Sequence, residues 1–387
     1  MNMISILNRH IQKDRQALRR LSDAIWQHPE LAWHEHFAVR EATSYLRNAG
    51  FDPVTPCFGA ETAFQAESGH GGPAFALFAE YDALPEVGHG CGHNLICAAA
   101  LGAFRAVAEE LKAQDLPGRI VLLGSPAEES GGGKISLIEG GCLKGIDAAM
   151  MVHPSYRAMP DVGSTSIARF DVIFHGRPAH AASAPELGVN ALSAVNLLFA
   201  GVNAYREHIP ESARMHGIIT NGGDAPNITP ALASCRFFLR AVDEEWTETM
   251  TKRFFDIVHG AELMTGATAE IRPFNRPYMS RKPNAELNRV YLEGLSELGM
   301  KYVVPALGGR GSSDFGNVSR AVPGVHPYFP VADRKIPGHS GEFREASGTD
   351  LAFDNAMIAA AAMANTAFRY ITDPGFKADV DRDFREH

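Results

Sequence analysis

The alternation of short apolar runs with helical patterns constrains the fold of this chain more than any other feature. Apolar runs at residues 75–79, 120–124 and 148–152 predict buried strands, and helical periodicity lies between them at 95–111 and 134–139. Two parallel strands need a long crossover connection, which a helix supplies. Strands that alternate with helices therefore predict an α/β domain with a mostly parallel sheet.

The order of the predicted elements changes after residue 160. The pattern then indicates a strand, a helix, two strands, a helix and a strand, at 167–174, 190–208, 214–220, 231–239, 244–264 and 268–273. This βαββαβ order is typical of a ferredoxin-like unit. Helical patterns resume at 284–298 and 351–371. We therefore expect a ferredoxin-like domain at 163–276, inserted into a discontinuous α/β domain that covers 1–162 and 277–387.

Composition and charge exclude several classes of protein. The 387 residues are 45% hydrophobic, which is enough for about two domains with separate cores. The net charge of −9 does not favour nucleic acid or an anionic membrane as a partner. The charged N-terminus and the lack of a run of about 18 apolar residues predict neither a secretory signal nor a membrane span. The five cysteines are odd in number and form no CxxC pair, so we expect a reducing compartment and a cytoplasmic protein.

Side chains that can ligate a metal follow three of the predicted strands. They are Glu80, Asp82, His89, Cys91 and His93 after the first strand, Glu128 and Glu129 after the second, and His153 after the third. In open α/β sheets, ligands bind beyond the carboxyl ends of the strands. We therefore expect these groups to converge on one crevice, with His339 as a further candidate from far along the chain.

The combination of a thiol, imidazoles and carboxylates predicts a metal site. Taken alone, His153 would be a capped or solvated histidine, and Cys91 would be a small buried apolar residue. Packing does not explain Cys91 and His93 separated by one glycine, whereas thiolate, imidazole and carboxylate are ligands that zinc prefers. The adjacent Glu128 and Glu129 allow one carboxylate to ligate while the other stays free as a base.

Three segments resemble motifs of other kinds of active site, but their residue spacing does not match those motifs. The GGGKIS segment lacks the first glycine of a phosphate-binding loop, because Glu128 stands at that position. GHSGE lacks the second glycine of a nucleophile elbow. The His34-Glu35-His36 triplet is not the HExxH helix of zinc peptidases.

Seven segments together resemble the M-twenty metallopeptidase family, and its amidohydrolase and aminoacylase branch in particular. In chain order they are HPELAWHEH, EYDALPEVGHGCGHNL, GSPAEESGGGK, MMVHP, GRPAHAASAPELGVNAL, TNGGDAPNITP and GHSGEF. The resemblance implies an α/β catalytic domain interrupted by a βαββαβ lid, and a homodimer formed through the lid. It also implies metal-dependent hydrolysis of an amide bond in an N-acyl amino acid or a dipeptide.

The resemblance also implies a role for individual residues near the metal. Two divalent ions, Zn or Mn with Co or Ni as further candidates, would be held by Cys91, His93, Glu129, His153 and His339. Glu128 matches the general base, and Asp82 matches the acid that orients a ligand or the base.

Three lid residues match positions that act on the substrate. His180 matches a histidine that reaches the partner subunit's active site and stabilises the oxyanion, although it could also be a capped turn residue. Asn227 and Arg240 match residues that hold the substrate's carboxylate or carbonyl. An arginine would do this through its bidentate fork, whereas an unengaged Arg240 would be a surface charge.

Two alternatives stay open at this point. The chain could be a non-catalytic or regulatory binding subunit of a hydrolase. It could also be an amidohydrolase that acts on an aryl amine or an aminobenzoyl-glutamate-like substrate.

Overall fold

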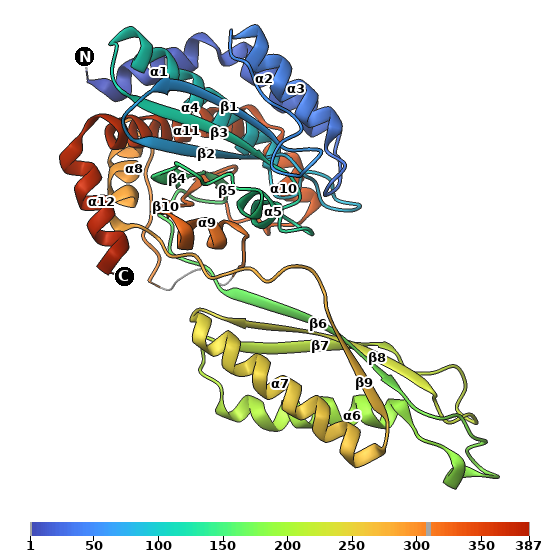
Figure 1. Ribbon diagram of the computed structural model, residues 1–387. Helices are drawn as coiled ribbons and strands as arrows, with labels where there is room; N and C mark the ends of the chain where they lie inside the picture. The colour runs from blue at the N-terminus through green and yellow to red at the C-terminus, as the bar shows by residue number, and fades with distance from the viewer. Residues whose placement is uncertain (1, 307–310, 387) are drawn as a thin grey trace. The chain divides into compact units, whose positions relative to one another are not determined.

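The computed structural model describes residues 2–306 and 311–386, which form two compact units (Figure 1). The first unit runs through Gly163 and resumes at Arg281 and again at Ser313. The second unit comprises Ser164–Ser280 and a short return that includes Ser312.

The first unit is built on a five-stranded sheet in the order β1-β3-β2-β4-β10. Its strands are β1 (Phe64–His70), β2 (Ala74–Glu80), β3 (Gly118–Ser125), β4 (Ala148–Met150) and β10 (Gly324–Val325). Only β1 is antiparallel to its neighbour, and the other pairs are parallel. A separate parallel pair joins β5 (His153–Ser155) to β11 (Tyr328–Pro330). The sheet is therefore mixed and mostly parallel, as the sequence predicts.

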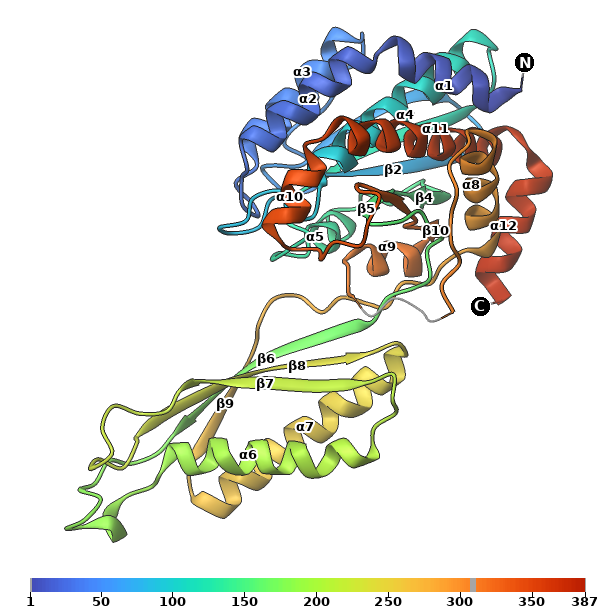
Figure 2. The ribbon, with the colours of Figure 1, turned by 180° about the vertical axis from the view of Figure 1, so that it is seen from behind.

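Helices cover both faces of this sheet (Figure 2). They are α1 (Met3–Lys13), α2 (Arg15–Gln27), α3 (His36–Asn48), α4 (His93–Ala113), α5 (Gly133–Glu139), α8 (Ala285–Glu297), α9 (Phe315–Ala321), α10 (Gly341–Ser347), α11 (Asp350–Thr372) and α12 (Pro374–Glu386). Helices α4 and α11 pack together over one face, and α5 and α9 lie on the other.

The central strand β2 shows why this layering is stable. All of its residues are buried, since a strand covered on both faces needs apolar side chains in continuous sequence. Phe75 and Leu77 join the core formed with α4 and α11, and the alternate residues Ala76 and Phe78 join the core on the opposite face. The strand ends at Glu80, so its carboxyl end carries the first polar side chain.

The second unit has the βαββαβ order that the sequence predicts. Its antiparallel sheet, in the order β7-β8-β6-β9, consists of β6 (Ser166–His175), β7 (Arg214–Asn221), β8 (Leu232–Ala241) and β9 (Thr268–Pro273). Helices α6 (Ala191–Tyr205) and α7 (Glu244–Thr265) cover one face and enclose a core with Phe174, Phe237 and Phe254. Strand β7 is an edge strand.

No helix in the described part of the chain combines the length and apolar character needed to cross a membrane.

Candidate metal centre

The candidate ligands of the first unit gather at the carboxyl ends of its parallel strands, where open α/β sheets bind ligands. Glu80 ends β2, and His93 is the first residue of α4. Glu128 and Glu129 follow β3, and His153 opens β5. The turn into α4 depends on Gly92, whose φ is 72° and where a Cβ would lie 2.9 Å from Pro154 Cγ. The backbone therefore places these side chains together at the carboxyl ends of the parallel strands.

Asp82 connects two of the segments that carry ligands. Its Oδ1 accepts a hydrogen bond from His93 Nδ1 at 2.9 Å, and its Oδ2 accepts one from the Glu129 backbone N–H at 3.0 Å. This arrangement fixes the ring of His93 and leaves Nε2 without a hydrogen-bond partner among the described residues. Burial works to lower the pKa of His93, but the Asp82 and Glu80 carboxylates outweigh it and raise the pKa to about 10.

His153 is held in the tautomer that binds a metal through Nε2. Its Nδ1 donates to the Pro154 carbonyl at 2.8 Å, which leaves Nε2 free. Burial lowers the pKa of His153 to about 4, so its imidazole is neutral at pH 7. The rings of His93 and His153 meet edge to face, with centroids 5.8 Å apart.

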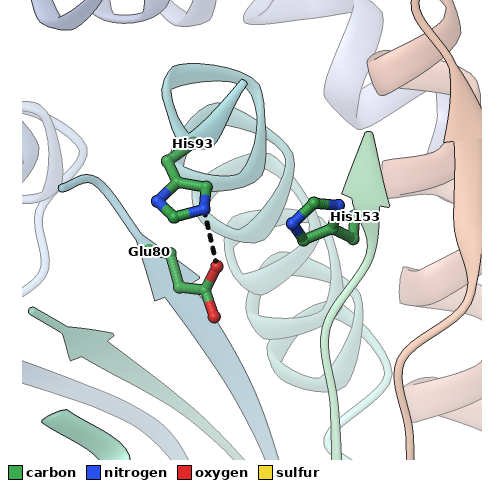
Figure 3. A group of neighbouring side chains, drawn as sticks. All are labelled: Glu80, His93 and His153. Carbon is green, nitrogen blue, oxygen red and sulfur yellow. Dashed lines mark ion pairs between the residues drawn. The ribbon is translucent and has the colours of Figure 1, made fainter. Parts of the chain in front are cut away.

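Two overlapping groups of side chains could each hold an ion. Ligand atoms of Glu80, His93 and His153 lie within 4.8 Å of one another, as do those of Cys91, His93 and Glu129. Figure 3 shows Glu80 and His93 facing each other, with His153 alongside. Nε2 of His93 lies 3.4 Å from Glu80 Oε2 and 3.7 Å from Glu129 Oε1. Buried polar atoms without hydrogen bonds are costly, so these donors fit a pair of divalent ions.

The surroundings of Cys91 and Glu128 raise the pKa of both groups. Burial and the Glu129 carboxylate, which accepts a hydrogen bond from the thiol, raise the pKa of Cys91 well above its usual range. Burial and the carboxylates of Glu129 and Glu80 raise the pKa of Glu128 well above its usual range. Positive charge in the site would reverse both effects, because a coordinating thiol is deprotonated and a nearby cation favours a carboxylate.

His339 lies at the margin of this group. Its side chain is 66% exposed, and its Nε2 is 4.0 Å from Glu129 Oε1. Its backbone has a φ of 59°, and its N–H donates to the Gly90 carbonyl at 3.1 Å. A left-handed backbone is uncommon for histidine, so the sequence pattern does not predict the backbone conformation of this turn.

The structure adds a buried ion network that no sequence pattern predicts. Lys134 Nζ donates to Glu80 Oε1 and, at 2.7 Å, to Asp314 Oδ1. The Lys134 backbone N–H also donates to Asp314 Oδ2 at 2.9 Å. Burial works to lower the pKa of Lys134, but the Asp314 and Glu80 carboxylates outweigh it and raise the pKa. GGGKIS is therefore not a phosphate loop but the start of a helix that places a cation behind the site.

Glu35 is a second residue that the sequence pattern does not reveal. Its Oε1 accepts from the Trp33 N–H at 3.0 Å and the Ala127 N–H at 2.8 Å, and its Oε2 accepts from the Thr62 hydroxyl at 2.8 Å. Ala127 has a φ of 58° and directly precedes Glu128, so Glu35 braces the turn that carries the paired glutamates. Burial and the Asp82 charge raise the pKa of Glu35 to about 7.

The predicted catalytic residue His180 and the predicted substrate-binding residues Asn227 and Arg240 belong to the second unit. His180 Nδ1 accepts from the Ala182 and Ser183 N–H groups at 3.2 Å, and the Asn227 carbonyl accepts from the Ala181 N–H at 3.0 Å. The loops of His180 and Asn227 therefore lie side by side.

Arg240 lies on β8 and lines a cavity of about 390 Å³. It donates to Ser312 Oγ at 3.2 Å, and no carboxylate among the described residues pairs with it. Burial, followed by the nearby Arg169 charge, lowers the pKa of Arg240. A partly buried guanidinium without an anionic partner is suited to receive a substrate carboxylate.

A family model described as peptidase family M20/M25/M40 matches residues 76–364, which is more than half of the chain. The chain belongs to this peptidase family. It is 38% identical over 395 residues to a mouse Xaa-Arg dipeptidase, covering 97% of this chain and 90% of the relative. It is 36% identical over 308 residues to one of the subunits of Escherichia coli p-aminobenzoyl-glutamate hydrolase, covering 75% of this chain and 64% of the relative.

The fold is also that of solved structures in the family. One is a dinuclear metal-binding peptidase from Bacillus subtilis, which superposes with a TM-score of 0.72 at 19% identity and covers 93% of this chain and 99% of that one. The family match and the named hydrolase relatives identify the chain as a metal-dependent hydrolase of amide bonds.

The buried carboxyl of Glu35 predicts a specific pH dependence of stability. Its pKa is raised from 4.5 to about 7 on folding, so the folded state binds its proton more tightly than the unfolded state. Its contribution to stability is therefore complete below pH 4.5 and is lost as the pH rises through about 7. Glu35→Gln cannot ionise at this position. Between pH 4.5 and about 7, we therefore expect the wild type to lose about 3 kcal/mol more of its free energy of unfolding than Glu35→Gln loses. Denaturant titrations at several pH values measure this difference, and parallel curves for the two proteins would contradict the prediction.

Proposed function

We propose that this hydrolase cleaves the amide bond of a dipeptide or an N-acyl amino acid. The proposal is supported by the donors of Cys91 and His93, which are buried, and of Glu129 and His153, which are partly buried, beside a second glutamate, Glu128. The relatives' names support the substrate class, since one relative is a dipeptidase and another hydrolyses p-aminobenzoyl-glutamate.

Cys91, His93, Glu129, His153 and His339 would hold two divalent ions, with Zn or Mn as the first candidates. When bound, such ions polarise the scissile carbonyl and lower the pKa of a water molecule toward about 7. Asp82 orients His93 and the backbone of Glu129 through the two hydrogen bonds described above. A ligand thiol must stay reduced, and the five cysteines are free, so we place the protein in the cytoplasm.

Glu128 is the proposed general base. Its carboxylate would take a proton from the attacking water and deliver it to the leaving amine nitrogen. Burial and the neighbouring carboxylates raise its pKa, whereas cations bound beside it would favour the carboxylate form that acts as a base.

We expect Glu128→Ala to retain its metal and to lose nearly all turnover, by a factor on the order of 10²–10⁴ in kcat. Elemental analysis and initial rates measure the two quantities on the same sample. Substantial activity in metal-loaded Glu128→Ala would contradict the role of Glu128.

His180, Asn227 and Arg240 are proposed to act on the substrate, with His180 serving the active site of the partner subunit. His180 would stabilise the oxyanion, while Asn227 and Arg240 hold the substrate's carboxylate or carbonyl. A homodimer through the lid is supported by β7, an edge strand that exposes Ile218 at 64% and Ile219 at 46%. Such an exposed apolar edge is a template for pairing with another chain.

Mixing two inactive variants tests the shared site. His180→Ala and Glu128→Ala should each be inactive, but a mixed dimer contains one site with both residues intact. We therefore expect activity to return when the two variants are unfolded, mixed and refolded together. Variants refolded separately and then combined without exchange are the control. Mixed dimers that stay inactive would contradict the shared site.

A second substrate class is favoured by the similarity to the aminobenzoyl-glutamate hydrolase of Escherichia coli. Amide hydrolysis that releases an aryl amine would use the same metal centre. A panel of dipeptides, N-acyl amino acids and aminobenzoyl-glutamate, read by released amine after loading with Zn, Mn or Co, separates the two classes. Tight binding of all members without turnover would contradict both and favour a non-catalytic role in binding.

A further inference from the structure

We infer that Glu80 is a direct ligand of the metal ion held by His93 and His153, in addition to its role as the charge partner of Lys134. The inference rests on the proposed metal centre and adds a carboxylate to its ligand set.

The two oxygens of Glu80 have different surroundings. Oε1 accepts a hydrogen bond from Lys134 Nζ, whereas Oε2 is fully buried and has no hydrogen-bond partner among the described residues. Oε2 lies 3.4 Å from His93 Nε2, a buried atom that also lacks a hydrogen bond (Figure 3). Because Lys134 fixes one end of the carboxylate, the other oxygen is held toward the histidine.

The spacing of these two atoms suits a shared ion. Ligand atoms about 2.0–2.2 Å from one ion, at a tetrahedral angle, lie about 3.3–3.6 Å apart. The distance between Glu80 Oε2 and His93 Nε2 is 3.4 Å, and His153 completes a group of ligand atoms within 4.8 Å of one another. A group of one carboxylate and two imidazoles is a common set for a divalent ion.

The charges behind the site lead to the same conclusion. Glu80, Lys134 and Asp314 are fully buried, so one cation faces two carboxylates. Lys134 and Asp314 form two hydrogen bonds with each other, through the side-chain Nζ and the backbone N–H. With Lys134 paired to Asp314 as well, the other oxygen of Glu80 faces His93 as an ion pair, and a divalent ion between them would take the place of the proton on His93 Nε2. A buried charge without such compensation is strongly destabilising.

Two matched variants separate ligation from simple charge balance. Glu80→Gln leaves Lys134 paired with Asp314, and Asp314→Asn leaves Lys134 paired with Glu80. Each variant therefore keeps one buried ion pair, but only Glu80→Gln removes the carboxylate that faces His93. Calorimetric titration of metal-free, full-length protein with Zn²⁺ and with Mn²⁺ measures the number and affinity of the ions, and the absorption spectrum of the Co²⁺ form reports the coordination.

We expect the wild type and Asp314→Asn to bind two ions with affinities that agree within about threefold. Glu80→Gln should bind one ion more than about 100-fold more weakly, since the loss of an outer contact alone typically costs about 10- to 100-fold in metal affinity. Its Co²⁺ spectrum should also change, whereas that of Asp314→Asn should not.

Two results would overturn the inference. One is wild-type affinity and an unchanged Co²⁺ spectrum in Glu80→Gln. The other is an equal loss of affinity in both variants, which would assign the effect to the Lys134 network. A wild type that binds no ion would instead contradict the proposed metal centre itself. If Glu80→Gln does not fold, a crystal structure of the metal-loaded wild type decides, because a ligand oxygen must lie about 2.0–2.2 Å from the ion.

Discussion

The hydrogen bonds of one buried carboxylate, Asp82, organise the metal centre. One oxygen fixes the ring of His93 at the start of α4, and the other binds the backbone of Glu129 after β3. Burial alone would raise the pKa of Asp82, but His93 and the Glu129 N–H outweigh it and lower the pKa. Asp82 thus remains ionised and joins the ends of two neighbouring strands. Without it, the His93 ring and the Glu129 backbone would lose their common hydrogen-bond acceptor.

The site concentrates negative charge in the interior, where charge is costly unless it is paired. Glu35 accepts a hydrogen bond from the turn at Ala127, and its pKa of about 7 leaves it only partly charged at neutral pH. Glu80 and Asp314 are both paired with the Lys134 ammonium group. Around Glu128 and Cys91, burial and neighbouring carboxylates prevail, and the pKa values of both groups are raised. Divalent ions would therefore stabilise the fold as well as supply the chemistry.

The sequence predicts the scaffold well where a pattern is local. The buried strand β2 and the helix α4 are evident from continuous apolar runs, and the polar residues that follow the strands lie together as expected. The edge strand β1 is not predicted, because its sequence, FQAESGH, is half polar. Lys134 and Asp314 are 180 residues apart, and Glu35 is 92 residues from Ala127. Such pairs exist only after the chain has folded, so no local pattern marks them. The roles of His180, Asn227 and Arg240 stay predictions, since their own unit shows only their local contacts.

Anomalous diffraction from crystals of the metal-loaded protein locates bound ions without reference to activity. We expect two peaks about 3.5–4 Å apart. One should be bonded to His93 and His153, and the other to Glu129, with Cys91 within bonding distance of at least one of them. A single peak, or peaks that lie only on surface residues away from His93, would contradict this expectation.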